Sequence, residues 1–396
     1  MKKMFITQEI GSIQRPVWRQ KLNAPANKQW IGSALEWGKK LGVKEAIELA
    51  NNSGRGLLQK DGEKRTPEEK NRIIDIASLY VIRMLEQSGL DRIFNGENPG
   101  TEMYDTVASR TRGISTAGTL NSFDANYFKK GIIDGELSIS PNGIEFFDES
   151  YAFVSKNSKK IVKPCLSGPY TMADWSYIEH HRAKREKIGD NPFDALNRGR
   201  SDAIIEFAKN VHSPIVKSLA KKGARVIQLD EPAATTKEFE SEIFVDSINE
   251  SFNGIPDFVE KAVHLCYSNY PVLFPYLAEC KANSYLIEFT NHASPTYFSP
   301  DQVSHEAYQI IELFNEYKMD VNVGVGVIDI HSDVIETPEV VRDRLLHAAK
   351  LIGNPQKVQV NPDCGLRTRR WEIAYPKLVN MVKGAKLAAK ELGETE

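Results

Sequence analysis

The stretch KAVHLCYSNY, residues 261–270, places His264 and Cys266 two positions apart within an apolar run. Residues i and i+2 of a strand point to the same face of the sheet. An imidazole and a thiolate are both metal ligands, so a strand here would aim two ligands at one point. The apolar run itself is typical of a parallel strand that is buried on both faces.

Seven further runs have the same character, and they predict the fold. All are short, rich in Val, Ile and Leu, and separated by helical patterns or longer segments. The eight runs are MFITQEIGS from residue 4, RIFNGE from 92, KIVKPCLSGPYT from 160, ARVIQLDEPA from 224, KAVHLCYSN from 261, SYLIEFTN from 284, DVNVGVGVIDIHS from 320 and KVQVNPDCGL from 357. This order predicts an α/β protein, a (β/α)8 TIM barrel formed as a single domain by residues 1–396.

Capping residues mark several of the helices between these runs. Thr66 precedes Pro67 and a run that ends before Gly89, and Thr337 precedes Pro338 in the same way. Two longer segments interrupt the alternation. We expect an insertion at about 101–160, after the second strand, in which SISPNGIEFFDESYAFV forms a small hairpin, and a long loop at about 178–197.

Composition excludes several classes of protein. The chain has 396 residues, 41% of them hydrophobic, and a formal net charge of −2. Nothing in this balance indicates a nucleic acid or a membrane surface as a partner. The N-terminal residues form no signal peptide and no run is long enough to span a membrane, so we expect a cytoplasmic protein. Four cysteines in such a chain indicate metal binding or burial rather than a disulfide framework.

The predicted strand ends carry an unusual set of soft ligands. His264 and Cys266 end the fifth strand, Glu288 the sixth and Cys364 the eighth. Each alone is explained by a core histidine, a core cysteine or a capping glutamate, but together they favour a metal site. The two thiolates favour zinc over magnesium or calcium. A substrate thiol on such a zinc loses its proton and stays nucleophilic, which favours alkylation of sulfur. Cys165 and Cys280 are interpreted as structural.

Other strand ends suggest a substrate site. Glu97 and Asp230 suit an ammonium group, while Ser12 and nearby backbone N–H groups suit a carboxylate, although all three are also ordinary loop-capping residues. His331 follows the seventh strand, where it is either a surface histidine or a residue that handles protons. Trp175 either stacks on a flat ring or belongs to the core.

Together, EIGSIQRP, QLDEPA, HLCYSN, LIEFTN, GVIDIHS and NPDCGLRTR resemble the catalytic C-terminal barrel of cobalamin-independent methionine synthase, in its short, single-barrel archaeal and bacterial form. The resemblance implies Zn2+ on His264, Cys266, Glu288 and Cys364, and a proton donor at His331. It also implies a pterin contact at Trp175. The implied homocysteine contacts are Ile10, Gly11, Ser12, Glu97 and Asp230.

The chain departs from this family on the side of the methyl donor. The long members carry a second barrel that helps to hold folate, and this chain has no counterpart. After DEPA the folate-dependent members read LRE where this chain reads ATTKE, so Thr236 replaces a glutamate that contacts the pterin. We therefore expect a methylated pterin or folate, or a methylcorrinoid protein, as the donor.

The resulting hypothesis is a zinc-dependent methyltransferase that methylates the thiol of L-homocysteine to give methionine. One alternative is a related zinc enzyme that alkylates another thiol, such as coenzyme M, although the sulfonate of that substrate would be repelled by Glu97 and Asp230. Another is a non-catalytic, zinc-stabilised barrel that binds a corrinoid protein.

Overall fold

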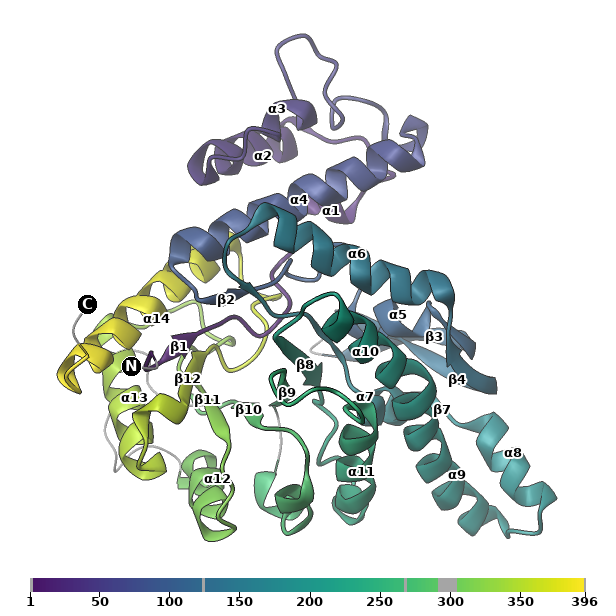
Figure 1. The fold of residues 1–396 in the computed structure, drawn as a ribbon. Helices are drawn as coiled ribbons and strands as arrows, with labels where there is room; N and C mark the ends of the chain where they lie inside the picture. The colour runs from purple at the N-terminus through teal and green to yellow at the C-terminus, as the bar shows by residue number, and fades with distance from the viewer. Residues whose placement is uncertain (1–2, 123–124, 267–268, 291–304, 395–396) are drawn as a thin grey trace.

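A computed structural model describes residues 3–122, 125–266, 269–290 and 305–394 (Figure 1). The fold is mixed α/β and is built on a seven-stranded sheet in the order β1-β12-β11-β10-β9-β8-β6, in which every neighbouring pair is parallel. The strands of this sheet are β1 (Ile6–Thr7), β6 (Cys165–Ser167), β8 (Val226–Asp230), β9 (Glu260–Leu265), β10 (Ser284–Ile287), β11 (Asn322–Gly326) and β12 (Val358–Asn361).

Each of the eight predicted apolar runs contains a strand. The second run holds β2 (Arg92–Ile93), which pairs in parallel with β5 (Ile161–Val162). The third run is divided into β5 and β6 by Lys163 and Pro164, because a proline has no N–H to donate to a ladder. A parallel bridge between Gln8 and Arg92 places the end of β1 beside β2.

The predicted insertion contains a hairpin, but at a different place from the one expected. Strands β3 (Thr111–Ser122) and β4 (Ala125–Ile139) are antiparallel, and β7 (Ser176–Tyr177) joins β4 in parallel. The segment read as a hairpin, 138–154, is instead mostly helix α6 (Pro141–Asn157). Ser140 caps this helix by accepting a hydrogen bond from the N–H of Gly143, and Pro141 occupies its first turn.

The segment 178–197, expected as a long loop, is also helical. It holds α8 (Glu179–Lys187) and the first turns of α9 (Pro192–Glu206), which Asn191 caps with its side chain. The polar composition of α8 suggested a loop, but ion pairs to other elements, such as Arg185 to Asp202 on α9, hold it as a helix on the surface.

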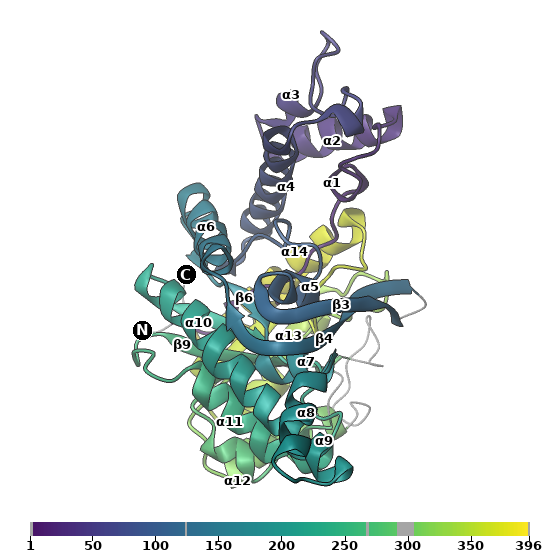
Figure 2. The same ribbon diagram turned by 90° about the vertical axis from the view of Figure 1, so that its right-hand side faces the viewer.

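Further helices lie between and around the strands, and some of them stand away from the sheet. They are α1 (Val17–Gln20), α2 (Lys28–Leu41), α3 (Ala46–Leu49), α4 (Pro67–Ser88), α5 (Met103–Ala108), α7 (Pro169–Asp174), α10 (Ser213–Lys221), α11 (Ser241–Ser251), α12 (His305–Glu316), α13 (Pro338–Ile352) and α14 (Trp371–Glu391). The predicted caps are present: Thr66 and Glu69 form a capping box on α4, and Thr337 caps α13. In Figures 1 and 2, α4 extends away from the sheet to carry α2 and α3, and the β3–β4 hairpin curves around α5.

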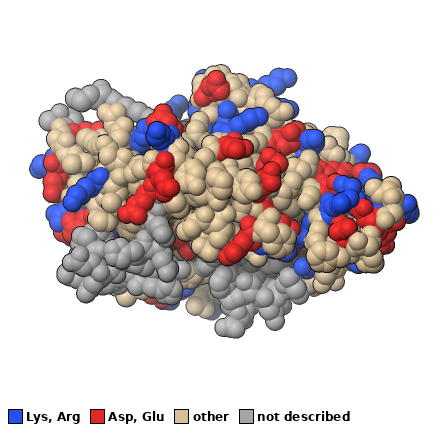
Figure 3. All heavy atoms as spheres, turned by 90° about the horizontal axis from the view of Figure 1, so that it is seen from below, with Lys and Arg blue, Asp and Glu red and all other residues tan. Residues whose placement is uncertain are grey.

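Two apolar clusters fill the molecule. The larger lies between the strands and the helices. The smaller contains only Ile10, Val226, Ala262 and Leu286, which come from or directly follow β1, β8, β9 and β10. Among the described residues, no helix is long and apolar enough to cross a membrane. The face shown in Figure 3 carries acidic and basic side chains side by side, in keeping with the small net charge.

Candidate metal centre and substrate pocket

The end of β9 brings two of the predicted metal ligands to the site. His264 lies in this strand and Cys266 follows it directly, and both side chains are buried. Cys364 arrives from the loop after β12. One ligand atom from each of the three residues lies within 4.8 Å of the others, so the structure places an imidazole and two thiols around a common point.

Hydrogen bonds fix the orientation of the imidazole. Nδ1 of His264 lies 2.9 Å from the carbonyl oxygen of Leu286, while Nε2 lies 3.4 Å from Sγ of Cys364. A carbonyl oxygen can only accept, so Nδ1 carries the proton. Nε2 is thereby turned toward the two thiols, which is the arrangement that metal-binding histidines use.

The two thiols differ in acidity. Their sulfur atoms lie 3.7 Å apart. This hydrogen bond, helped by the neighbouring His264, lowers the pKa of Cys364 well below that of an ordinary thiol, although burial opposes the shift. The same hydrogen bond together with burial raises the pKa of Cys266. Burial lowers the pKa of His264, but the Cys364 and Asp230 charges outweigh it and raise the value above normal. The more acidic thiol, that of Cys364, is therefore the one beside the imidazole.

Glu288, the fourth predicted ligand, follows β10 directly and is buried. Its charge is one of the causes that raise the pKa of Cys266, so it lies in the same neighbourhood. It is not a member of the group whose ligand atoms lie within 4.8 Å of one another. The structure thus unites three of the four predicted ligands and leaves the fourth beside them.

A second cluster combines the loop after β2, the first residue of β6 and the last residue of β8. Ligand atoms of Glu97, Cys165 and Asp230 also lie within 4.8 Å of one another. Gly11 borders the cluster and leaves space beside it, since a Cβ on Gly11 would lie 3.1 Å from Sγ of Cys165 and 3.2 Å from Oε1 of Glu97. The two predicted ammonium ligands are therefore together, beside the predicted Gly11. Sequence reasoning missed Cys165.

Glu97 reaches this cluster from a strained backbone conformation. Glu97 has φ 60° and follows Gly96 with φ 62°, so a non-glycine residue adopts the left-handed region. The conformation is held by the side chain of Asn95, which accepts from the N–H of Glu97 at 2.9 Å, and by Arg15, which donates to its carbonyl at 2.6 Å. Strain of this kind, of order 1–3 kcal/mol, is commonly stored at functional sites.

The carboxylates of this cluster need a cation. Burial, with the negative charge of Glu97, raises the pKa of Asp230 to about 7, although His264 and Gln228 oppose the shift. Burial also raises the pKa of Glu97, against the effects of Arg15 and Arg367. Oε2 of Glu97 is buried without a hydrogen-bond partner. A bound ammonium would restore the charged form of both groups.

A buried network beneath the cluster orients Asp230. The amide nitrogen of Gln228 donates to Oδ1 of Asp230 at 2.5 Å and to the carbonyl of Ile10 at 2.6 Å. Lys163 donates to the same carbonyl at 3.3 Å and to the side-chain oxygen of Gln228. The side chain of Ile10 packs in the small apolar cluster, so only its backbone can take part in a polar site. Sequence reasoning found neither Lys163 nor Gln228.

Glu9 adds a further carboxyl group to this region. Its side chain is 1% exposed and neither oxygen has a hydrogen-bond partner. Burial raises its pKa to about 7, with Lys163 opposing the shift and Glu97 adding to it. Ser12, by contrast, lies at the rim: a Cβ on Gly365 would lie 2.4 Å from its Oγ, so Ser12 adjoins the loop that carries Cys364.

The remaining predicted residues, His331 and Trp175, lie at loop and helix ends. His331 is exposed in the loop after β11, and its N–H donates to Asp329 at 2.7 Å. Trp175 is partly buried at the C-terminal end of α7, where its ring lies 6.3 Å from that of Tyr104.

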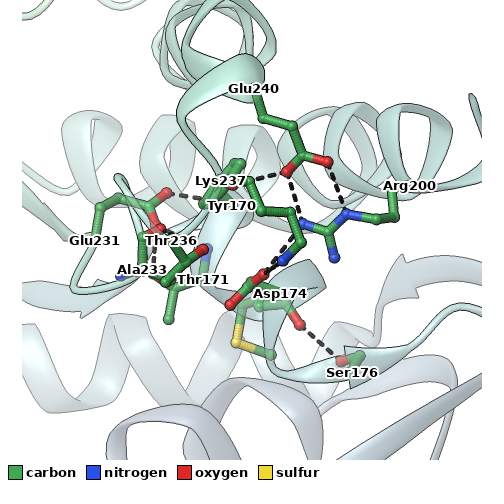
Figure 4. A network of polar contacts seen from close by, with 11 residues as sticks. Tyr170, Thr171, Asp174, Ser176, Arg200, Glu231, Ala233, Thr236, Lys237 and Glu240 are labelled. Carbon is green, nitrogen blue, oxygen red and sulfur yellow. Dashed lines mark hydrogen bonds and ion pairs between the residues drawn. The ribbon is translucent and has the colours of Figure 1, made fainter. Parts of the chain in front are cut away.

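Helix α7 is tied to the loop after β8 (Figure 4). The carboxylate of Glu231 accepts from the N–H of Tyr170 at 3.0 Å and from the N–H and hydroxyl of Thr171 at 2.8 and 2.5 Å. Burial nevertheless raises the pKa of Glu231 to about 8. Farther out, Arg200 binds Glu240 through two hydrogen bonds of 2.8 and 2.7 Å. The segment that contains Thr236 is therefore fixed between α7 and α9.

The fold and these side chains define the class of protein: an α/β enzyme scaffold with a potential metal site at the ends of its parallel strands. Residues 52–387 match the family model of the cobalamin-independent synthase catalytic domain. The chain belongs to the family of cobalamin-independent methionine synthases, and it is therefore a methyltransferase enzyme.

Relatives and solved structures agree with this assignment. The chain is 32% identical over 391 residues to methionine synthase of Thermoplasma volcanium, with 96% of each chain covered. It is 34% identical over 341 residues to methionine synthase of Thermoplasma acidophilum, with 83% of this chain and 92% of the relative covered. The fold resembles that of a B12-independent methionine synthase from Shewanella sp. W3-18-1, whose structure was solved in complex with selenomethionine. The TM-score is 0.72 at 22% sequence identity, and the match covers 98% of this chain and 99% of the other.

Membership of an enzyme family argues against the non-catalytic alternative. Methionine synthase activity implies transfer of a methyl group from a donor to homocysteine. The family is metal-dependent, and the His264, Cys266 and Cys364 group offers ligands for an ion.

Proposed function

We propose that this enzyme transfers a methyl group to the thiol of L-homocysteine with the help of Zn2+ held by His264, Cys266, Glu288 and Cys364. The observation that carries the proposal is the convergence of one imidazole and two thiols within 4.8 Å. Two soft sulfur ligands suit zinc and exclude magnesium or calcium as the preferred ion.

The donor set fits a zinc ion that also accepts a substrate. Three ligands converge closely, and the buried carboxylate of Glu288 stands beside Cys266 as the fourth. Zinc bound here would lower the pKa of the homocysteine thiol so that sulfur attacks as an anion. Nδ1–H of His264 donates a hydrogen bond to the carbonyl of Leu286, so Nε2 is left available as a metal ligand.

The second cluster supports binding of the amino-acid end of homocysteine. Glu97 and Asp230 would hold the ammonium group, and Gln228 keeps the Asp230 carboxylate turned into the pocket. Ser12 and the backbone of Ile10 and Gly11 would hold the carboxylate. The two clusters are contiguous because Asp230 and His264 are register partners on the neighbouring strands β8 and β9.

The donor side is proposed from the sequence and from the position of α7. Trp175 would contact a flat methyl donor, either a methylated pterin or folate or a methylcorrinoid. His331, in the loop after β11, would take up or return a proton. As sulfur forms its bond to the methyl carbon, the bond between that carbon and the donor breaks.

We also propose that the strands form a complete (β/α)8 barrel and that residues 1–396 make one domain. The parallel pairing of β2 with β5 and the bridge between Gln8 and Arg92 support closure between β1 and β6. A cytoplasmic location stays a prediction from the sequence.

The test is a methionine assay on purified, zinc-loaded protein. Homocysteine is supplied with methylcobalamin in one sample and methyltetrahydrofolate in another, and coenzyme M replaces homocysteine in matched samples. Methionine from either donor supports the proposal, and the better donor identifies the carrier class. Methylated coenzyme M without methionine would overturn the assignment of the acceptor and favour the alternative thiol.

A further inference from the structure

The cluster of Glu97, Cys165 and Asp230 contains one more group than an ammonium site requires. Two carboxylates are sufficient for an alkylammonium ion, and a neutral thiol adds little to its binding. Cys165 is 6% exposed, and its sulfur lies with the carboxylate oxygens inside the same 4.8 Å limit that holds for the first cluster. A buried thiol facing two carboxylates calls for a different ligand.

We propose that Glu97, Cys165 and Asp230 form a second site for a soft divalent cation such as Zn2+, overlapping the ammonium position, so that excess zinc competes with homocysteine. The metal site stands on the geometry alone. The overlap rests on the function proposed above, in which Glu97 and Asp230 hold the substrate ammonium.

The geometry needs only a small closure around an ion. Ligands at roughly 2.0–2.3 Å from a tetrahedral zinc ion lie roughly 3.3–3.8 Å from one another, and the three ligand atoms here lie within 4.8 Å of one another. Gly11 leaves the approach open, because a Cβ at that position would meet both Cys165 and Glu97. The left-handed backbone at Glu97 holds its side chain at the cluster.

The balance of charge also favours a dication. Oε2 of Glu97 is buried without a partner, and Asp230 has a hydrogen bond from an uncharged amide at Oδ1. Among the cations nearby, Lys163 donates to the carbonyl of Ile10 and to Gln228, Arg15 donates to the carbonyl of Glu97, and Arg367 lies 3.9 Å from Glu102. Binding of a metal ion would displace the thiol proton of Cys165 to solvent. Two carboxylates and one thiolate would then exceed the ion's charge by only one.

There is room for water as a further ligand. A cavity of about 30 Å³ adjoins the site, and its lining includes Glu97, Cys165 and Ser167 together with residues of α5 and α6. A water molecule needs roughly 10–15 Å³ of such space, so the cavity accommodates one beside the ion. A three-ligand site completed by water is a common arrangement for zinc.

Cadmium titration of metal-free protein tests the site directly. Cd2+ prefers the same soft ligands as zinc and gives an ultraviolet absorption band with thiolates. We expect two equivalents to bind. The first, at Cys266 and Cys364, carries two thiolates, so the second, at Cys165, should give about half its absorbance. Saturation at one equivalent, in the presence of correctly folded protein, would overturn the proposal.

Variants identify the second step. Cys165→Ser and, separately, Glu97→Gln should lose the second equivalent and keep the first, which also shows that each variant is folded. Cys280→Ser is the matched control, because Cys280 belongs to neither cluster and both equivalents should remain. A second step that survives in Cys165→Ser would contradict the assignment.

The overlap is tested with L-methionine, which has the ammonium group but no free thiol to chelate the metal. At about ten times its Kd, methionine should raise the cadmium concentration that half-fills the second site about tenfold and leave the first site unchanged. Two equivalents with no effect of methionine would overturn the overlap and with it the ammonium assignment, while the metal count would stand. The two failures are therefore distinguishable.

Discussion

Nε2 of His264 lies 3.4 Å from Sγ of Cys364, although the two residues are 100 positions apart in the chain. The contact joins the end of β9 to the loop after β12. A core histidine and a core cysteine have no reason to meet across two intervening strands. The approach is explained when both groups are ligands of one ion, and the first prediction follows from it.

Removal of either thiol of the first cluster should abolish metal binding at that cluster. Cys266→Ala and Cys364→Ala should each lose the first equivalent of zinc and lose methionine formation by roughly 100-fold or more, since even outer partners of a metal ligand are worth about 10–100-fold. Metal analysis and the methionine assay check this. Cys280→Ala is the control and should keep both. Full zinc content and activity in Cys266→Ala would refute the metal assignment.

Neutral replacements at the second cluster should weaken homocysteine binding. Asp230→Asn removes a charge that we assign to the substrate ammonium, and a hydrogen bond to a charged group is worth about 1.5–3 kcal/mol. The KM for homocysteine should therefore rise roughly 10- to 100-fold, while the first zinc equivalent remains. Steady-state kinetics with the methyl donor at saturation measure the change. An unaltered KM with reduced kcat would mean that Asp230 acts elsewhere in the reaction.

Glu9 should make the stability of the protein depend on pH. Its pKa is raised by burial from 4.5 to about 7, so the folded chain keeps a proton that the unfolded chain releases. The free energy of unfolding contributed by this group therefore falls as pH rises from about 4.5 to about 7, by about 3 kcal/mol at most, and is level above that. Glu9→Gln removes the dependence. Relative to wild type, the variant should gain stability between about pH 5 and about pH 8.

Urea unfolding of metal-free protein at the two pH values measures this difference. The comparison is between the pH slopes of wild type and variant, because Asp230 and Glu231, whose pKa values are also raised by burial, contribute equally to both. Parallel slopes would show that Glu9 titrates as an ordinary glutamate in the folded chain.

Loss of the paired hydrogen bonds between Arg200 and Glu240 should weaken binding of the methyl donor. Both side chains are nearly buried, at 10% and 9% exposure. Glu240→Ala leaves the guanidinium with Asp174 as its remaining ion-pair partner, at 3.1 Å, and should cost about 3 kcal/mol of stability. Because the pair fixes the loop after β8 against α9, we expect the KM for the methyl donor to rise more than that for homocysteine.

Urea unfolding and two-substrate kinetics test this prediction together. Lys222→Ala is a suitable control, since its ion pair with Asp148 is long, at 3.9 Å, and the lysine is exposed. Equal effects of Glu240→Ala on the two KM values would argue that the loop has no separate role on the donor side.

The sequence predicted the strands and much of the first cluster because both depend on local pattern. Apolar runs identify buried parallel strands, and side chains two apart share a face, which united His264 with Cys266. Contacts between residues far apart in the chain could not be predicted in this way. Cys165 was interpreted as structural because its partners, Glu97 and Asp230, come from strands 68 and 65 positions away. No spacing rule connects such residues.

The error at 138–154 has a local cause. Its apolar residues were interpreted as strand alternation, yet Ser140 and Pro141 repeat the cap that correctly marked the helix after Thr66. Capping residues carried more information there than hydrophobic pattern, because an N-cap satisfies backbone donors wherever the helix lies.

Asp230 and His264 occupy the same register position on β8 and β9. Adjacent strands are held by a ladder of hydrogen bonds, so the separation of these two residues is among the least adjustable in the molecule. If Asp230 binds the amino group and the metal held by His264 binds the sulfur, the fixed separation of the two residues selects the length of the carbon chain between them. Cysteine, shorter by one methylene, would fail to reach both ends, and discrimination between the two amino acids would be a property of the sheet itself.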